Sequence, residues 1–203
     1  MTIFLMRHGE PTYRDTAEMG LPGMGAELGQ LTAEGIAQAE AAAKDPRIQD
    51  ADLIVSSPYP RALHTAAIVS RRIDCPIEVA VGIFEWLPRI DYSAASHTEI
   101  TEAWKEYKAN AGVHRPDDRY PHWETHEQMR ARAKKALAPF FGRTDIGKLL
   151  IVCHGGIMRA LMNTPALKKI HYCEIYELTP EMLIDHAECG MRNAGGEPLR
   201  AMI

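Results

Sequence analysis

Two histidines and two arginines stand where they could form a reactive phosphate pocket. His8 and His154 each follow a short apolar run and precede a glycine, while Arg7 adjoins His8 and Arg61 lies just inside a predicted helix. Arginine forks bind phosphoryl oxygens, and a glycine lets the backbone approach a ligand closely. A neutral imidazole can attack phosphorus when its other ring nitrogen is fixed as a donor. Either histidine alone would indicate a structural role, but the four side chains together predict a phosphate pocket that contains a nucleophile.

The chain around these residues alternates between expected strands and expected helices. Apolar runs predict strands at residues 2–6, 53–55, 77–81, 148–153 and 172–178. Capping residues and glycine or proline boundaries predict helices at residues 33–43, 61–71, 96–112, 125–139 and 157–162. This alternation indicates an α/β fold of three layers, α/β/α, with a mostly parallel central sheet. Ligands bind beyond the carboxyl ends of strands in such sheets, where the two histidines and two arginines are expected.

The composition is typical of a chain that folds without a metal or a disulfide. Its 203 residues are 46% apolar and 25% charged, with a formal net charge of −4. We therefore expect one domain over residues 1–203 and neither a nucleic-acid nor a membrane partner. The four cysteines lie far apart, the apolar runs are too short to cross a bilayer, and the N-terminus lacks a secretory signal. These features predict a cytoplasmic protein that needs no cofactor.

Four separated segments resemble the histidine phosphatase superfamily, also called phosphoglycerate mutase-like. They are residues 5–10 (LMRHGE), 31–35 (LTAEG), 56–66 (SSPYPRALHTA) and 152–156 (VCHGG), with a weaker fifth segment that joins Glu124 and Thr125 to Arg132. The resemblance implies a phosphoglycerate mutase-like fold in which His8 becomes a phosphohistidine. It also implies that Arg7, Arg61 and His154 hold the phosphoryl group. Gly155 is expected to contact the same group through its backbone.

The family also has an acidic residue between the second arginine and the last histidine, which protonates the leaving oxygen. Glu85 matches that position in this chain. The aromatic neighbours Phe84 and Trp86 predict apolar surroundings of the kind that suit an acid catalyst. Glu78 and Glu99 are lesser candidates for the same role.

Three positions depart from the family pattern. Pro11 stands where many members have a small hydroxyl residue, and Arg14 stands where they have an asparagine that helps to bind phosphate. Arg14 is counted here among the phosphate-binding residues as a third cation, although it could instead point to solvent. Cys153 replaces the more usual threonine or serine before the last histidine. A buried and inert thiol is expected there, with reversible oxidation as the alternative.

Residues 84–124 are expected to form an inserted lid over the phosphate pocket. They contain all three tryptophans, which suits a phosphorylated organic molecule with an apolar or planar part. Trp104 and Tyr107, three apart on one expected helix, are predicted to pack onto the core instead. His122 and His126 have the spacing of a helical zinc pair, but Thr125 is a predicted helix cap that would leave His122 outside the helix. No metal site is therefore expected, and the glycine-rich loop at residues 23–29 is expected near the pocket mouth.

These features together predict a metal-independent phosphatase that acts on a small phosphorylated metabolite in two steps. His8 would attack phosphorus, Glu85 would protonate the leaving alkoxide, and the same carboxylate would then activate water. One alternative is phosphoglycerate mutase-type phosphoryl transfer, which uses the same pocket. Another alternative is a non-catalytic member that binds a phospho-ligand or a partner protein. The tail at residues 185–203 could be loosely ordered or contribute to a homo-oligomer, and both remain open.

Overall fold

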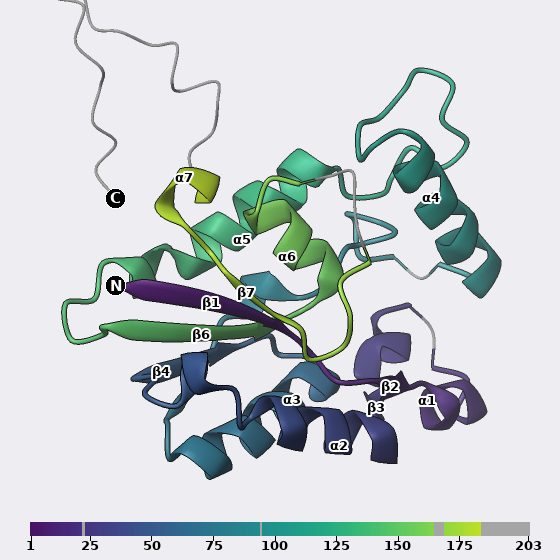
Figure 1. Cartoon of the computed structure of the whole chain (residues 1–203). Helices are drawn as coiled ribbons and strands as arrows, with labels where there is room; N and C mark the ends of the chain where they lie inside the picture. Colours follow the sequence, from purple (N-terminus) through teal and green to yellow (C-terminus); the bar gives the residue numbers. More distant parts are fainter. Residues whose placement is uncertain (22, 94, 165–168, 184–203) are drawn as a thin grey trace, which may run out of the picture.

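The computed structural model describes residues 1–21, 23–93, 95–164 and 169–183, which surround one five-stranded sheet. The strand order is β5-β4-β6-β1-β7; Figure 1 labels β4, β6, β1 and β7 of this sheet. The four parallel members are β1 (Thr2–Arg7), β4 (Leu53–Ser56), β5 (Ile77–Val79) and β6 (Lys148–Cys153). The edge strand β7 (Ile175–Glu177) pairs antiparallel with β1. The predicted α/β fold with a mostly parallel sheet is therefore confirmed.

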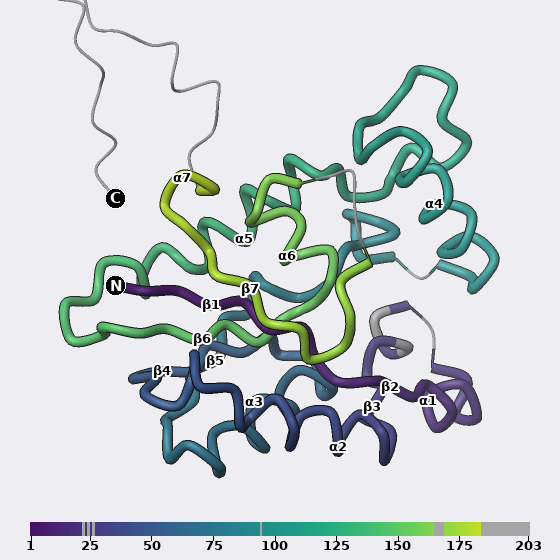
Figure 2. Tube along the Cα trace, viewed as in Figure 1, coloured from purple at the N-terminus to yellow at the C-terminus, as the bar shows by residue number. Residues whose placement is uncertain are grey.

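Strand residues alternate between two hydrophobic cores, one on each face of the sheet. Leu5 of β1 and Ile151 of β6 join the core that includes Met129 of α5 (His126–Phe141) and Ile157 of α6 (Gly155–Leu161). Their neighbours along the strands face the opposite core, which includes Ala62, Ala66 and Val69 of α3 (Pro60–Ile73). Helix α2 (Ala33–Ala42) packs beside α3, so the trace in Figure 2 has α2 and α3 on one side of the sheet and α5 and α6 on the other. Strands covered on both faces read as nearly continuous apolar runs, as β1 and β6 do.

The predicted helix caps are present, while several element ends differ by a few residues. Thr32, Ser96 and Thr125 each accept a hydrogen bond from the backbone N–H three residues later. Helix α4 (His97–Ala109) ends before the predicted 112, and α5 continues two residues past Pro139 because the buried Phe140 holds its last turn against the core. Helix α6 begins at Gly155 rather than at 157. Strand β5 ends at Val79, and β7 has three residues instead of the predicted seven.

Short elements complete the described chain. They are β2 (Pro11–Thr12), α1 (Arg14–Glu18), η1 (Gly23–Leu28), β3 (Gln30–Leu31), η2 (Pro46–Ile48), η3 (Val81–Ile83) and α7 (Pro180–Leu183). Strands β2 and β3 form a separate antiparallel pair next to η1. In the part of the chain that is described, no helix has the length and apolarity needed to cross a membrane. The stretch 185–203, for which an oligomer contact was left open, lies outside the described residues.

The tryptophans expected in a pocket roof pack mainly on one another and on the core. The ring of Trp104 stacks on Tyr107 at 5.1 Å between centroids, Trp86 lies 5.1 Å from Trp104, and Trp123 lies 5.5 Å from Tyr107. The predicted core packing of Trp104 and Tyr107 is thus confirmed. Trp86 and Trp123 belong to the same core cluster, so these rings stiffen the segment between η3 and α5. The division into one domain with a lid at 84–124 stays a prediction.

Candidate active site

The carboxyl ends of three neighbouring strands bring the predicted residues to one place. Arg7 ends β1, His154 follows β6, and Pro60 opens α3 shortly after β4. Backbone hydrogen bonds join these ends, because the His8 N–H donates to the Cys153 carbonyl at 3.0 Å and the Ser57 N–H donates to the Val152 carbonyl at 3.0 Å. The arrangement follows from the parallel pairing of β4, β6 and β1.

The loop after His8 is fixed by close backbone contacts with the start of α2. The side chain of Thr32 accepts from the Gly35 N–H and donates to the Glu10 carboxylate at 2.8 Å. A Cβ atom on Gly9 would collide with the Gly35 carbonyl oxygen, and one on Gly35 would collide with the Glu10 carbonyl oxygen. Segments 5–10 and 31–35 therefore act together, since only glycine lets the two backbones approach this closely.

His8 is held as a neutral imidazole whose Nε2 is unprotonated. Its Nδ1 donates to the Gly9 carbonyl oxygen at 2.7 Å, and a carbonyl can only accept. The proton is therefore on Nδ1, and Nε2 keeps its lone pair, which accepts from the Arg61 Nε–H at 3.3 Å. Burial, the nearby charge of Arg61 and, less, that of Arg7 lower the pKa of His8 to about 3, against the raising effect of the Gly9 hydrogen bond. At neutral pH this nitrogen can act as a nucleophile.

His154 faces His8 across the same site. The two ring centroids lie 5.0 Å apart at an interplanar angle of 62°. His154 is fully buried, and its Nε2 is hydrogen-bonded to the Ser57 hydroxyl at 2.7 Å. Burial, followed by the charge of Arg61, holds the pKa of His154 well below its usual range. Its Nδ1 has no hydrogen-bond partner among the described residues, which leaves a buried polar atom suited to a ligand oxygen.

Each of the two arginines lies against an aromatic ring. Arg7 donates to the Ile170 carbonyl at 2.6 Å, and its guanidinium carbon lies 4.1 Å from the Tyr172 ring centroid. Within the described residues the Nε of Arg7 is buried without a hydrogen-bond partner. It lies 3.7 Å from the point where Gly155 would carry a Cβ, so glycine leaves room beside this donor. The guanidinium of Arg61 is 2% exposed and lies 4.8 Å from the Tyr59 ring.

Glu85 reaches the first turn of α6, next to His154. Its Oε1 accepts from the Trp86 N–H at 2.9 Å, and its Oε2 accepts from the Gly156 N–H at 3.3 Å. A Cβ on Gly156 would collide with the Glu85 carboxylate, so the second glycine of this segment makes room for the acid. The half-buried carboxyl group is thus fixed at the start of α6, next to His154, rather than solvated at the end of a strand.

The weaker fifth segment supports the loop that carries Glu85. Glu124, 3% exposed, is ion-paired with Arg132 at 2.6 Å. The same guanidinium donates to the carbonyls of Gly82 at 2.6 Å and Phe84 at 3.0 Å, and its carbon lies 3.8 Å from the Phe84 ring centroid. This pair therefore fixes the backbone on the N-terminal side of Glu85.

Arg14 does not join the other predicted phosphate-binding residues. It starts the short helix α1, its side chain is 77% exposed, and its Nε lies 3.5 Å from Asp15 and 3.9 Å from Glu18. The i,i+4 spacing within α1 favours this local pairing over a reach into the site. The expectation of a third cation in the pocket is therefore wrong for Arg14, and the solvent alternative applies.

Other candidates have structural surroundings. Glu78 is ion-paired with Arg143 at 2.6 Å on the surface, and Glu99 with Arg89 at 2.9 Å. Cys153 is fully buried, and burial raises the pKa of its thiol, so the inert interpretation is favoured.

The histidine pair considered for zinc is separated by the helix start, as predicted. His126 is the first residue of α5 and is buried near the Tyr107 hydroxyl, whereas His122 is exposed before the helix. No cluster of three or more His, Cys, Asp or Glu residues in the described ranges could hold a metal ion.

Four residues that touch the central groups were not predicted from the sequence. Ser57 and Tyr59 contact His154 and lie within segment 56–66, so the resemblance of that segment to the family could have indicated them. Glu27 lies in the glycine-rich loop that was expected near the mouth of the phosphate pocket. No feature of the sequence indicated its ion pair with Arg61. Tyr172 lies far along the chain from Arg7, and only the return of β7 beside β1 brings it there.

The lowered histidine pKa values predict acid-sensitive stability. Unfolding returns His8 from a pKa of about 3 to 6.5, so between these values the unfolded chain binds more protons and stability falls as pH falls. Each such histidine contributes a slope of up to about 1.4 kcal/mol per pH unit. We expect urea unfolding to give a steeper loss of stability from pH 6.5 to pH 5 in the wild type than in His8→Asn. Equal slopes in the two proteins would contradict the buried neutral state of His8.

Comparison with known proteins gives one family and a consistent set of relatives. The family model described as "Histidine phosphatase superfamily (branch 1)" matches residues 3–180. An uncharacterized phosphatase, PhoE, of Bacillus subtilis is 31% identical over 165 residues, which are 79% of this chain and 75% of that protein. A probable phosphoglycerate mutase, GpmB, of Proteus mirabilis is 25% identical over 81% of this chain and 74% of its own length.

A solved structure shares the fold. The mycobacterial glucosyl-3-phosphoglycerate phosphatase superposes with a TM-score of 0.64 at 24% identity, over 88% of this chain and 89% of that one. At this level of identity the likeness concerns the arrangement of helices and strands. It agrees with the sheet order and flanking layers described above.

Proposed function

The chain belongs to the histidine phosphatase superfamily, and from that premise we propose that it hydrolyses a small phosphomonoester through a phosphohistidine at His8. The single observation that carries the proposal is the tautomer of His8, whose Nδ1 donates to the Gly9 carbonyl while Nε2 keeps its lone pair. A histidine with only a structural role does not need an unprotonated ring nitrogen directed toward an arginine. Phosphatases among the relatives and the structural neighbours support the same class of reaction.

In the first step, the His8 Nε2 lone pair forms a bond to phosphorus as the phosphorus–oxygen ester bond breaks. Arg7, Arg61, the His154 ring and the Gly155 backbone hold the phosphoryl oxygens, and the two arginines balance their charge. Glu85 gives its proton to the departing alkoxide, which leaves as an alcohol. Because the Arg61 Nε–H donates a hydrogen bond to Nε2, Arg61 must turn its donors from His8 to the phosphoryl oxygens as the substrate binds.

In the second step, water replaces the imidazole at phosphorus. The Glu85 carboxylate, now deprotonated, takes a proton from the water molecule as its oxygen bonds to phosphorus. The phosphorus–nitrogen bond breaks, its electron pair returns to His8 Nε2, and inorganic phosphate leaves. The enzyme is restored with Glu85 protonated and His8 neutral, so the cycle balances.

Phosphoglycerate mutase-type transfer is the second candidate, because relatives at 25% to 28% identity are described as probable phosphoglycerate mutases. That reaction would return the phosphoryl group from His8 to a product instead of to water. Incubation with 3-phosphoglycerate separates the two, since a phosphatase releases phosphate and a mutase forms the 2-isomer. A non-catalytic member would form no acid-labile phosphoenzyme with any phosphomonoester.

Removal of metal ions is expected to leave the rate unchanged. In the proposed steps, arginine, histidine and backbone donors hold the phosphoryl charge that a metal holds in other phosphatases. Phosphate release from 4-nitrophenyl phosphate should stay within about twofold after dialysis against EDTA. A loss restored by added Mg²⁺ or Zn²⁺ would overturn the metal-independent mechanism.

The substrate class and location belong to the same proposal. A small phosphorylated molecule fits a buried phosphate site with two histidines and two arginines. The spaced cysteines favour a reducing compartment, and we place the protein in the cytoplasm on that ground.

A further inference from the structure

The carboxylate of Glu27 is hydrogen-bonded to Arg61, the arginine that would bind the proposed phosphoryl group. Both outer nitrogens of Arg61 donate to Glu27, NH2 to the carboxylate at 2.8 Å and NH1 to the backbone carbonyl at 2.9 Å. Glu27 lies on η1, in the glycine-rich loop, and its side chain is 34% exposed. The other end of Arg61, Nε, points at His8. A dianionic phosphoryl group therefore reaches this guanidinium only by displacing the carboxylate of Glu27.

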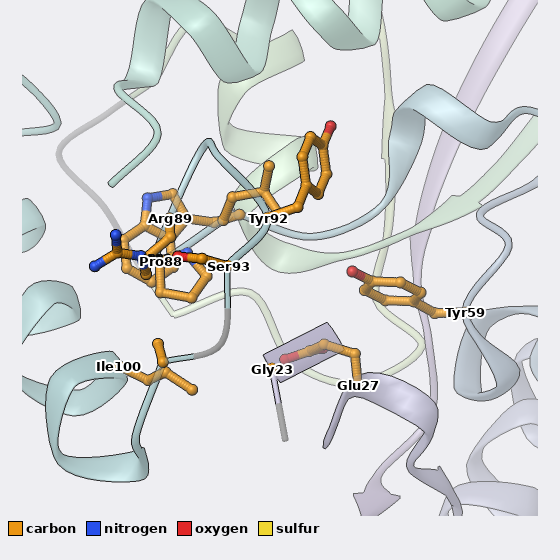
Figure 3. Close-up of a pocket in the computed structure, with 11 residues that line it drawn as sticks. Gly23, Glu27, Tyr59, Pro88, Arg89, Tyr92, Ser93 and Ile100 are labelled. Carbon is orange, nitrogen blue, oxygen red and sulfur yellow. Dashed lines mark hydrogen bonds between the residues drawn. The ribbon is translucent and has the colours of Figure 1, made fainter. Parts of the chain in front are cut away.

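Glu27 also lines a cleft that adjoins the phosphate site. The cleft lies between η1 and the segment before α4, and Figure 3 shows Glu27 and Tyr59 across it from Arg89 and Ile100. Tyr59 links the two regions, because its ring lies 5.3 Å from His154 and 4.8 Å from the Arg61 guanidinium. A group attached to phosphorus that points past Tyr59 therefore enters this cleft.

The walls of the cleft are aromatic and apolar. Tyr59 and Tyr92 line the cleft. The buried ring of Phe84, which does not line it, lies 6.1 Å from Tyr59 and 6.5 Å from Tyr92. Tyr92 is 57% exposed and has a φ of 58°, a left-handed conformation that is unfavourable for a bulky residue. The exposed ring of Tyr92 suits stacking against a planar or apolar group at the rim of the cleft.

The charge of the cleft excludes an anionic leaving group. Its charged lining residues among those described are Glu27 and Arg89. Arg89 is already neutralised, because its guanidinium pairs with Asp91 at 2.9 Å and with Glu99 at 2.9 Å. When the phosphoryl group binds Arg61, the carboxylate of Glu27 is displaced. Among the described residues that line the cleft, no unpaired arginine then remains for it. A second anion placed there would be repelled, whereas a hydroxyl or ammonium group could bind Glu27.

We propose that the leaving group of the substrate is planar or apolar and carries no negative charge, and that Glu27 enforces this choice by exchanging between Arg61 and the leaving-group cleft. The inference rests on the proposed phosphatase function, and it makes Glu27 a specificity-determining residue of that site. It also makes 3-phosphoglycerate, whose leaving group carries a carboxylate, a poor substrate.

The exchange is tested without catalysis by titrating orthophosphate into the protein in a calorimeter. Glu27→Gln removes the charged competitor for Arg61, so we expect about tenfold tighter phosphate binding than in the wild type. Glu34→Gln, which removes an equal charge from the exposed first turn of α2, is the matched control and should bind as the wild type does. Unchanged or weaker phosphate binding by a folded Glu27→Gln would overturn the exchange.

The choice of leaving group is tested with three para-substituted phenyl phosphates that carry aminomethyl, methyl or carboxymethyl groups. The methylene keeps their phenols similar as leaving groups, so charge is the main difference. The wild type should hydrolyse the carboxymethyl ester with a kcat/KM about tenfold below that of the aminomethyl ester. Glu27→Gln should reduce that ratio to about threefold or less, while Glu34→Gln preserves it.

The outcomes separate the two proposals. Equal rates with all three esters, or a preference for the carboxymethyl ester, would overturn the inference and leave the phosphatase function standing. Hydrolysis of none of them by the wild type, without an acid-labile phosphoenzyme, would overturn the phosphatase function and the inference with it.

Discussion

Replacement of His8 by alanine is expected to lower phosphate release at least a thousandfold, to about the level left by electrostatic binding alone. The Nδ1 proton of His8 is committed to the Gly9 carbonyl, which leaves the buried Nε2 lone pair directed toward Arg61. Water would have to attack phosphorus directly in the variant, without a base placed behind it. Steady-state release of phosphate from 4-nitrophenyl phosphate measures the loss.

Two further measurements identify the cause of that loss. The wild type mixed with a ³²P-labelled substrate and quenched in alkali should carry a label that is stable in base and lost in acid, and the alanine variant should carry none. His64→Ala is the matched control, since His64 lies exposed on α3, three residues from Arg61. His8→Ala should still bind orthophosphate, because Arg7, Arg61 and His154 remain. Retention of most of the activity by His8→Ala would refute the mechanism.

The central groups of the site could be predicted because local patterns determine where they lie. Arg7, His8 and His154 follow apolar runs that can only be buried parallel strands, and such strands end at one edge of the sheet. The caps at Thr32, Ser96 and Thr125 are likewise local hydrogen-bonding patterns, and each is present. These features depend on a few neighbouring residues, which the sequence displays directly.

The features that the sequence did not predict, or predicted wrongly, depend on tertiary packing. Arg14 has the right position along the chain, but the short helix that begins there turns it toward Asp15 and Glu18. The aromatic residues between 84 and 124 divide between core and cleft by contacts with α4 and α5, which composition does not encode. The pairing of Glu27 with Arg61 joins residues 34 apart through the fold of η1 over the site.

Glu85→Gln is expected to have an effect that depends strongly on the leaving group. An alkyl phosphate needs its departing alkoxide protonated, so loss of the acid should lower its turnover by about a hundredfold to ten-thousandfold. The stable anion of 4-nitrophenol leaves without a proton, so phosphorylation of His8 by this ester should be slowed much less. Glutamine can still accept the N–H bonds of Trp86 or Gly156 through its amide oxygen, which preserves the local backbone.

The second role of Glu85 makes the same variant diagnostic. If the carboxylate also activates water, breakdown of the phosphohistidine becomes slow, and 4-nitrophenyl phosphate should give a burst of about one nitrophenolate per active site followed by slow turnover. Glu78→Gln, which removes a surface carboxylate paired with Arg143, should show no burst. Equal losses with alkyl and nitrophenyl esters, without a burst, would assign Glu85 to substrate binding. A burst with a preserved nitrophenyl phosphorylation rate would instead assign both half-reactions to one carboxyl group. The hydrogen bond from the Gly156 N–H fixes that group at the start of α6, beside His154, where it can serve both steps.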